Sequence, residues 1–426
     1  MTHPGSRCAW DAITLRSGQG GPAIVKASID TATRISSVFL CAVLVCAGIA
    51  DAQIDLVPEG SLGYEPSLSV AEPLARDDAR KPRFEFPTLD GPLPSYDECD
   101  YCGGDGCAVC CNCMPRRWVS FELLLLWRRS MSLPVIAQNG GFGSRVLFGG
   151  ERVGGGLTAG GRLDFGVWLD DQATEGIGAT FFGAGEKQVT FDSNDTGESV
   201  VVRPFLENGV PTGLVVHDPA AGVVGNVTAQ TTSDVLGTDI YYRRLIWSDP
   251  ITRIDLLTGY KMSRIDESLV IRHRFVDGGN VLDGFDRFMT TNEFHGGALG
   301  VLAKHQAPRW SVEVLGRLGL GNMRGNVAIS GSDLTGLTNN GSLLARSSNA
   351  GLTRSNQFTA VRELGIKFAY QVRPRAELTI GYSFMHWKHV LQPGDQVNVN
   401  LPNPPLILND SSYYVHGLDF GLICRF

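Results

Sequence analysis

Charge is scarce in this sequence of 426 residues. Charged residues make up 19% of the chain, which is below the roughly 25% that is typical of soluble domains. The formal net charge is −7, and no concentrated basic stripe occurs. Binding of nucleic-acid phosphates needs such a stripe, so a nucleic-acid partner is not expected. Glycine is abundant instead, with 52 residues, and suits strands and turns better than helices.

Recognisable catalytic and phosphate-binding motifs are also missing. The chain contains neither G-x-S-x-G nor H-E-x-x-H, and no Gly-Lys-Ser/Thr follows the Gly-rich stretch at 149–161. His386 and His389 lie near an expected outer loop, but no acidic pair at a recognisable spacing accompanies them. The sequence therefore predicts no enzymatic activity and no cofactor.

Long apolar runs are absent except for one near the N-terminus. Arg34 precedes an apolar run from Val38 to Ala50, and Ala50-Asp51-Ala52 follows it. This run is shorter than the roughly 20 residues of a spanning helix. A positive flank, a short apolar core and an A-x-A site predict a secretory signal peptide that is cleaved after Ala52, with an uncleaved anchor as the alternative. Residues 1–52 would be the N-terminal extension with its signal, and the Pro-rich residues 53–98 a disordered linker.

Six of the ten cysteines gather in one segment at 99–117. They are Cys99, Cys102, Cys107, Cys110, Cys111 and Cys113. Two C-x-x-C pairs, Cys99/Cys102 and Cys107/Cys110, could complete a tetrahedral zinc site. Export from the cytoplasm favours disulfides instead, and six cysteines allow 15 pairings. We expect the cluster to be oxidised, with zinc binding and redox catalysis as alternatives.

From Trp118 onward, apolar and polar residues alternate with a period of two. "LDFGVWLDD" at 163–171, "WSVEVLGRLGL" at 310–320 and "LGIKFAY" at 364–370 all follow this pattern. Such alternation indicates strands that lie between two unlike environments. Residues 118–426 are therefore predicted to be all-β.

Loop lengths predict how these strands are connected. Short turns are expected at 170–174, 247–251, 305–309 and 372–375, and long connections near 130–155, 190–233, 265–288, 323–358 and 390–411. Ten strands of about 12–16 residues would lie between them. Short turns on one side and long loops on the other are typical of a bacterial outer-membrane barrel. We therefore predict a transmembrane antiparallel up-and-down β-barrel of about ten strands, with twelve as the alternative if "SLVIRHRF" or "NVAISG" forms an extra hairpin.

The C-terminus belongs to this pattern. Leu418, Phe420, Leu422, Cys424 and Phe426 form one alternate row up to the last position, with Asp419, Gly421, Ile423 and Arg425 between them. A closed barrel explains this, because the final strand must pair with the first, "WVSFELLLLWRR", and keep its lipid-facing side apolar.

Several stretches carry a family resemblance: "ELLLLWRR", "GSRVLFGGERV", "GGRLDFGVWLDD", "RIDLLTGYKM", "EFHGGALG", "YSFMHWKHVLQPGDQVN" and "GLDFGLICRF". Over about residues 115–426 the chain resembles a planctomycete-type family of outer-membrane β-barrel proteins, formerly a domain of unknown function. The resemblance implies a bacterial outer-membrane location and no assigned activity. It also implies that Phe426, with Leu418, Phe420 and Leu422, belongs to the signal read by the barrel-insertion machinery.

Charged residues at alternate strand positions are candidates for the barrel interior. They are Arg162, Asp164, Asp170, Arg253, Asp255, Lys261, Glu313, Arg317, Lys367, Glu377 and Asp419. In a barrel of about ten strands, groups of both signs can pair across the narrow interior and plug it. We therefore expect a structural or surface-binding barrel whose partners are membrane lipid and the insertion machinery. A narrow pore or porin for small solutes is the alternative, and an outer-membrane hydrolase is less favoured.

Overall fold

The computed structural model describes residues 115–141, 143–333, 342–401, 406 and 408–426. The predicted signal peptide, the linker and the cysteine cluster from Cys99 to Cys113 lie outside the described residues. Within the described part of the chain, no helix is long and apolar enough to cross a membrane.

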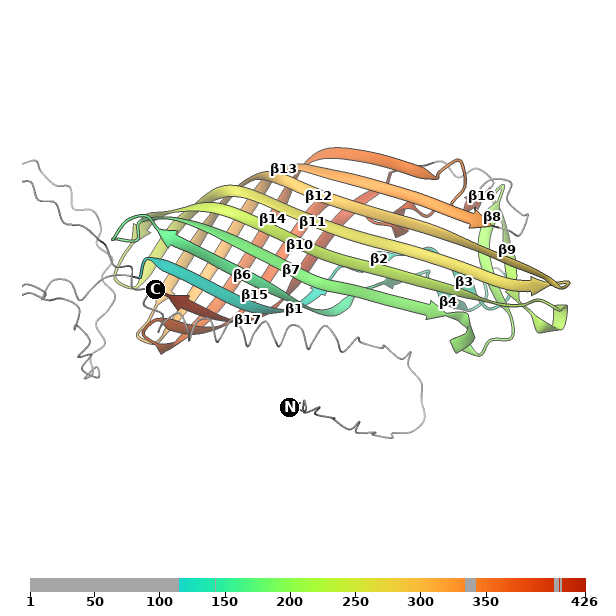
Figure 1. The fold of residues 1–426 in the computed structure, drawn as a ribbon, viewed down its shortest axis with the longest axis horizontal. Helices are drawn as coiled ribbons and strands as arrows, with labels where there is room; N and C mark the ends of the chain where they lie inside the picture. Colours follow the sequence, from blue (N-terminus) through green and yellow to red (C-terminus); the bar gives the residue numbers. More distant parts are fainter. Residues whose placement is uncertain (1–114, 142, 334–341, 402–405, 407) are drawn as a thin grey trace, which may run out of the picture.

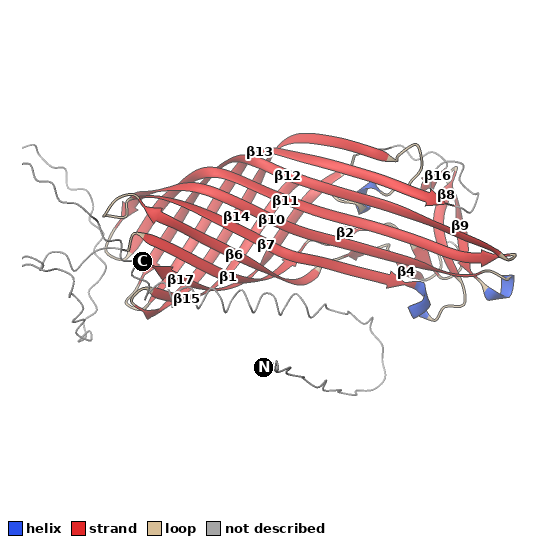
Figure 2. Cartoon of the chain, viewed as in Figure 1, coloured by secondary structure: helices blue, strands red, loops and turns tan. Residues whose placement is uncertain are grey.

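Ten antiparallel strands close into one barrel (Figures 1 and 2). They are β1 (Arg117–Arg128), β6 (Gly156–Trp168), β7 (Glu175–Asp192), β10 (Val224–Ser248), β11 (Thr252–Asp277), β12 (Asn280–Gln306), β13 (Trp310–Asp333), β14 (Gly351–Arg373), β15 (Ala376–Leu391) and β17 (Asp410–Arg425). Each strand pairs with the barrel strand that follows it, and β17 returns to β1. The prediction of ten strands is confirmed, and the alternative of twelve is wrong.

Closure of the barrel uses the chain to its last residue. Trp118 lies opposite Arg425 in the pairing of β1 with β17. Beyond this pair, the backbone N–H of Phe426 donates to the carbonyl of Arg117 at 2.9 Å, and the N–H of Arg117 donates back at 3.0 Å. In a lipid environment an open sheet edge would leave such groups without partners. The terminal residue is therefore part of the barrel wall.

The four short connections that were predicted from sequence all lie at one end of the barrel. They occupy residues 169–174, 249–251, 307–309 and 374–375. The C-terminus lies at this same end (Figure 1). In outer-membrane barrels the end with the short turns faces the periplasm, which orients the molecule.

Five strands are much longer than the sequence predicted. β10 to β14 have 23 to 27 residues each. The long loop predicted at 265–288 is wrong, because β11 and β12 continue to a two-residue turn at Gly278 and Gly279. Both glycines have positive φ, +54° and +83°, as the hairpin turns that match strand twist require. "SLVIRHRF" and "NVAISG" are the outer parts of β11 and β13, and neither forms an extra hairpin.

The long strands carry the barrel far beyond the membrane. β12 has 27 residues, which corresponds to about 90 Å along the strand. A strand tilt of about 40° leaves about 70 Å along the barrel axis, whereas the apolar band of such barrels is about 25 Å tall.

Shorter elements cover the outer end. They are β2 (Met131–Ser132), β3 (Ala137–Gln138), β4 (Val146–Phe148), β5 (Arg152–Val153), β8 (Val201–Glu207), β9 (Val210–His217), β16 (Asn400–Leu401) and the short 3₁₀ turns η2 (Ser193–Thr196), η3 (Pro219–Ala221) and η4 (Gly394–Gln396). β16, β8, β3 and β4 form a small sheet, with β9 paired to β8. The small sheet and β9 lie toward the end opposite the short turns (Figure 1).

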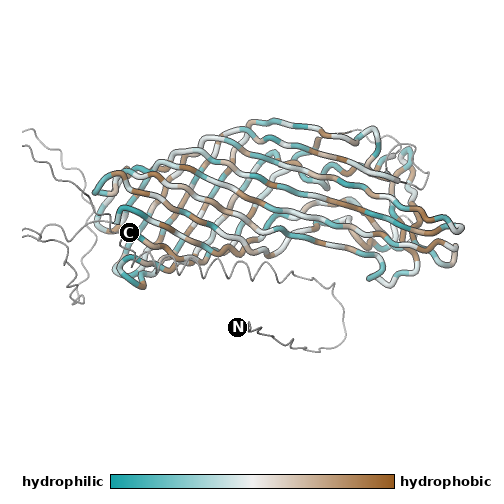
Figure 3. Tube along the Cα trace, in the orientation of Figure 1, coloured by the Kyte–Doolittle hydropathy of each residue, from teal (hydrophilic) through white to brown (hydrophobic). Residues whose placement is uncertain are grey.

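The polarity of the inward and outward positions reverses along the long strands. In β11, Ile254 and Leu256 point outward near the periplasmic end, while Arg253 and Asp255 are buried inside. Farther along, Leu269 and Ile271 are buried inside and Arg272 is exposed. Figure 3 shows this alternation of polar and apolar residues along the strands. The change marks where the outer surface of the barrel leaves lipid and meets water.

Candidate binding site in the barrel lumen

The predicted interior residues lie where the alternation placed them. Ten of the eleven are on barrel strands with their side chains toward the lumen: Arg162, Asp164, Arg253, Asp255, Lys261, Glu313, Arg317, Lys367, Glu377 and Asp419. Asp170 is the exception, because it lies in the periplasmic turn after β6.

Asp170 organises this turn. Its carboxylate accepts hydrogen bonds from the backbone N–H of Thr174 at 2.8 Å and of Glu175 at 2.9 Å, and from the Thr174 hydroxyl at 2.7 Å. Partial burial opposes the charged form, but these hydrogen bonds outweigh it and lower the pKa of Asp170.

The innermost ion cluster joins four strands. The Lys261 ammonium lies 3.0 Å from both carboxylate oxygens of Asp239 and 2.9 Å from Oε2 of Glu363. Arg317 Nη1 donates to Asp239 Oδ2 at 2.9 Å. All four side chains are less than 9% exposed. Two cations and two anions therefore neutralise one another across the lumen.

A second cluster surrounds Glu122 on β1. Arg162 Nη1 donates to Glu122 Oε2 at 2.9 Å and lies 3.3 Å from Asp419 Oδ2. Lys367 pairs with the other oxygen of Glu122, and the Ser383 hydroxyl donates to Asp419 at 3.1 Å. This cluster again contains two cations and two anions.

The third group of charges lies nearest the periplasmic mouth. Arg243 and Arg253 both donate to Asp255, each with its Nε at 2.9 Å. Their guanidinium carbons lie 4.9 and 4.6 Å from the ring centroid of Trp168, within the range of a cation–π contact.

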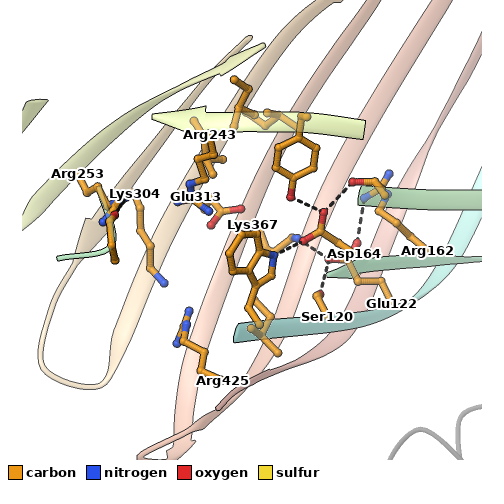
Figure 4. Close-up of a pocket in the computed structure, with 18 of the residues that line it drawn as sticks. Ser120, Glu122, Arg162, Asp164, Arg243, Arg253, Lys304, Glu313, Lys367 and Arg425 are labelled. Carbon is orange, nitrogen blue, oxygen red and sulfur yellow. Dashed lines mark hydrogen bonds and ion pairs between the residues drawn. The ribbon is translucent and has the colours of Figure 1, made fainter. Parts of the chain in front are cut away.

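Glu377 of β15, across the lumen, completes this group. It pairs with Arg425 through both oxygens and with Lys304 at 3.5 Å. In Figure 4, Lys304, Arg425 and Arg253 lie around one open space.

That space is a cavity of about 190 Å³ at the periplasmic half of the lumen. Besides these charges, Trp118, Trp168 and Tyr241 line it. Trp118 Nε1 and the Tyr241 hydroxyl both donate to Asp164 at 2.8 Å. The arrangement can bind small molecules that carry both charged and aromatic or apolar parts.

Above the cavity, apolar side chains fill the lumen. This apolar plug consists of Leu124, Leu126, Phe182, Ala184, Val235, Ile265, Phe294, Met323, Val361, Met385, Trp387, Val390, Tyr413 and Val415. Each is 6% exposed or less. The Trp387 indole N–H, which would otherwise be buried without a partner, donates to the Ser263 hydroxyl at 2.7 Å.

A second apolar core fills the outer end. Met131, Leu133, Ile136, Val201, Leu343 and Leu344 from the outer connections pack against Leu269, Ile271 and Phe288 of the barrel wall. At its edge, Arg203 of β8 donates to Asp286 of β12 at 2.7 Å and contacts His273 Nδ1 at 2.7 Å. The outer connections are thus packed into the lumen.

The two histidines near the outer rim do not share a site. His389 Nδ1 lies 3.1 Å from Asp410 Oδ2 in a partly exposed pair. His386 points to the outside of β15, because Met385 and Trp387 on either side of it are buried in the lumen. Among the described residues, no group of three or more His, Cys, Asp or Glu is arranged to hold a metal ion. The candidate zinc ligands Cys99, Cys102, Cys107 and Cys110 lie outside the described residues.

The residues of the proposed insertion signal follow one face of β17. Leu418 is exposed, and Phe420, Leu422 and Phe426 are half-buried. Their positions fit a lipid-facing row, whereas their role in insertion stays a prediction.

Sequence reasoning missed several partners of the interior charges, namely Glu122, Asp239, Arg243, Lys304 and Glu363. All of them occupy inward positions of strands. All five lie within strands that were predicted from sequence, so their parity with recognised inward residues was an available signal, as for Glu122 on β1 and Glu363 on β14.

Comparisons with known proteins agree with this architecture. The family described as Putative beta barrel porin-7 (BBP7) matches residues 118–426. A search of curated proteins finds no match.

Similar solved structures include the outer membrane protease OmpT from Escherichia coli, at 12% identity and a TM-score of 0.43, covering 73% of this chain and 97% of that chain. The translocator domain of the autotransporter NalP from Neisseria meningitidis matches at 11% identity and a TM-score of 0.30, over 73% and 88% of the two chains. The toluene transporter TodX from Pseudomonas putida matches at 10% identity and a TM-score of 0.25, over 73% and 90%. At these identities the likeness concerns the fold alone.

The family match covers most of the chain and confirms the resemblance on which the outer-membrane expectation was based. The chain therefore belongs to the Putative beta barrel porin-7 (BBP7) family of outer-membrane β-barrels.

Proposed function

We propose that this protein is a closed outer-membrane barrel with a structural or surface-binding role and no enzymatic activity. The observation that carries the proposal is the filled lumen. Ion clusters occupy the periplasmic half, and the apolar plug and the outer apolar core follow above them. A solute that crossed would have to displace packed side chains whose burial stabilises the barrel.

The projecting outer part of the barrel favours a surface role. Strands of 23 to 27 residues hold the outer elements well beyond the apolar band. Val224 of β10 and Val281 of β12 are exposed there, as is Val210 of β9. A rigid scaffold that presents loops away from the membrane suits binding of another surface molecule.

The second candidate is a narrow pore for small solutes. The charged periplasmic cavity of about 190 Å³ favours it, as does the porin name of the family. Conduction would require the apolar plug to move, since Trp387 and Phe294 are fully buried within it.

A hydrolase is the least favoured candidate. His389 has a carboxylate partner in Asp410, but a hydrolytic site of this kind needs a nucleophile or an activated water and a second catalytic group. Hydrolysis of peptides or lipids that is lost on replacement of His389 would support this candidate.

Single-channel recording in planar bilayers separates the first two candidates. The wild-type barrel should give no stable conductance steps. A variant with a reduced plug, Phe294→Ala with Met385→Ala and Trp387→Ala, serves as the positive control, because it empties the middle of the lumen. Stable steps from the wild-type protein would refute the closed barrel and support the pore.

A further inference from the structure

The outer surface of the barrel carries an unusual group of cations where the apolar band ends. Strands β14, β15, β17 and β1 are neighbours in the barrel. Their outward positions are apolar from the periplasmic end: Val372, Tyr370, Phe368, Ile366 and Leu364 on β14, Leu378, Ile380, Tyr382 and Phe384 on β15, and Phe121, Leu123, Leu125 and Trp127 on β1. The next outward residues are Arg362, His386 and Arg129.

These residues lie side by side across the strands. Arg362 is directly opposite His386, and His386 is directly opposite Tyr414. The backbone N–H of Arg129 donates to the carbonyl of Tyr414 at 2.9 Å. Lys388 is the next outward residue on β15 and is exposed. We call Arg129, Arg362 and Lys388, which surround His386, the boundary cation patch.

The cations of the patch have few anions nearby. Arg362, Lys388 and Arg129 are the charged groups that act on His386. Within the described residues, neither Arg362 nor Lys388 makes an ion pair, and Arg129 uses its guanidinium to bind the hydroxyl and carbonyl of Ser412. Two carboxylates lie near the patch. Asp410 pairs with His389 and accepts a hydrogen bond from Gln357. Asp395 lies on η4 near Arg129.

On the opposite side of the barrel, the cation at the same boundary forms ion pairs with carboxylates of the protein. There Arg264 of β11 pairs with Asp266 at 2.6 Å and with Glu293 of β12 at 3.4 Å. Asp234 of β10 lies opposite Asp266. Boundary cations are therefore neutralised by the protein on one side and left for an external anion on the other.

Aromatic rings lie directly below the patch. Phe384 stacks against His386 and Tyr414, with ring centroids 6.4 Å apart in each pair. Trp127 stacks on His416 at 6.0 Å, and the Tyr382 hydroxyl contacts His416 Nδ1 at 2.9 Å. Such rings mark the level at which acyl chains meet headgroups. An anion bound by the patch would thus sit at headgroup depth.

We propose that the boundary cation patch binds the phosphate of a phosphorylated lipid in the outer leaflet. Arg362, Lys388 and Arg129 would contact the phosphate oxygens, since guanidinium and ammonium groups form strong charge-assisted hydrogen bonds with phosphate. The acyl chains would lie along Leu364, Tyr382 and Leu125. The inference concerns the lipid-facing surface and holds for a closed barrel and for a pore.

Native mass spectrometry of the full-length protein with bisphosphorylated lipid A in detergent tests the proposal. The variant Arg362→Ala/Lys388→Ala removes two exposed cations of the patch. The matched control Arg272→Ala/Arg274→Ala removes two exposed outward cations of β11 that lie beyond the apolar band. Heat-modifiable gel mobility verifies that each protein is folded.

Wild type and control should bind lipid A equally, and the patch variant about thirtyfold more weakly, as expected for about 1 kcal/mol from each of two basic residues. Dephosphorylated lipid A should bind wild type as weakly as phosphorylated lipid A binds the variant. Inorganic phosphate at the same concentration should not displace the lipid. Equal binding of both lipids by wild type, unchanged binding by the patch variant, an equal loss in the control, or displacement by inorganic phosphate would each overturn the proposal. The comparison of two lipids on wild type stands even where a variant does not fold.

Discussion

Replacement of Lys261 by Met tests whether the innermost ion cluster stabilises the barrel. Lys261 holds Asp239 and Glu363 within 3.0 Å, and only Arg317 would remain between these two carboxylates. The cluster would change from neutral to a net charge of −1 in a site that is nearly inaccessible to water. Loss of one partner from a buried ion pair costs about 3–5 kcal/mol, so the free energy of unfolding should fall by about this amount.

The double variant Lys261→Met/Glu363→Gln is the matched control. It restores the charge balance, because one cation then faces one anion. We expect it to be more stable than Lys261→Met alone, with a coupling energy of about 1–3 kcal/mol in a double-mutant cycle. Urea unfolding of the barrel in lipid vesicles, followed by tryptophan fluorescence, measures the free energy of unfolding of the wild type, the two single variants Lys261→Met and Glu363→Gln, and the double variant. A cost below about 0.5 kcal/mol for Lys261→Met, or no rescue by the second substitution, would refute the reasoning.

Three further predictions concern the end of the chain and two turns. Phe426→Asp should lower the amount of protein in the outer membrane without blocking export, as fractionation would measure; a normal amount would contradict the role of the terminus. Gly279→Val should destabilise the β11–β12 hairpin by about 1–2 kcal/mol, because φ is +83° there, and unchanged unfolding would contradict this. Asp170→Asn should destabilise the turn at pH 7 and have a smaller effect at pH 3, because the lowered pKa of Asp170 gives stability that declines as the pH falls below about 4. An equal effect at both pH values would show that the charge of Asp170 does not matter.

The membrane part of the fold could be predicted because lipid on one face of each strand and a polar lumen on the other require apolar and polar residues to alternate. Lipid outside and a polar lumen inside produce the alternation seen in Leu163, Phe165 and Val167 against Asp164. The same alternation gave the inward positions of charges such as Lys261, and the loop lengths gave the short turns and the strand number.

The outer part was misread because the environment reverses there. Leu269, Ile271 and Phe275 alternate as regularly as the membrane strands, but they face an apolar core inside the barrel. With Gly278 and Gly279 following, this stretch was interpreted as a Gly-rich loop, although two adjacent glycines are also a hairpin signal.

The pairing of interior charges could not be predicted from one sequence. Lys261 and Glu363 lie 102 positions apart and on strands that are not neighbours. Their contact depends on the stagger and tilt of all ten strands, which side-chain alternation does not specify. The sequence could therefore predict which residues point into the lumen, but it could not predict which of them form ion pairs.

Thiol accessibility in the middle of the lumen tests the closed barrel most directly. Met385 is 1% exposed within the apolar plug, whereas Val210 is 64% exposed at the outer end. Met385→Cys and Val210→Cys would each be treated with a membrane-impermeant maleimide in folded protein in detergent, with the unsubstituted protein as the background for its native cysteines. A filled lumen predicts rapid labelling of Val210→Cys and labelling of Met385→Cys only after thermal unfolding. Labelling of folded Met385→Cys at a rate close to that of Val210→Cys would show that water and solutes reach the plug, and would contradict the closed barrel.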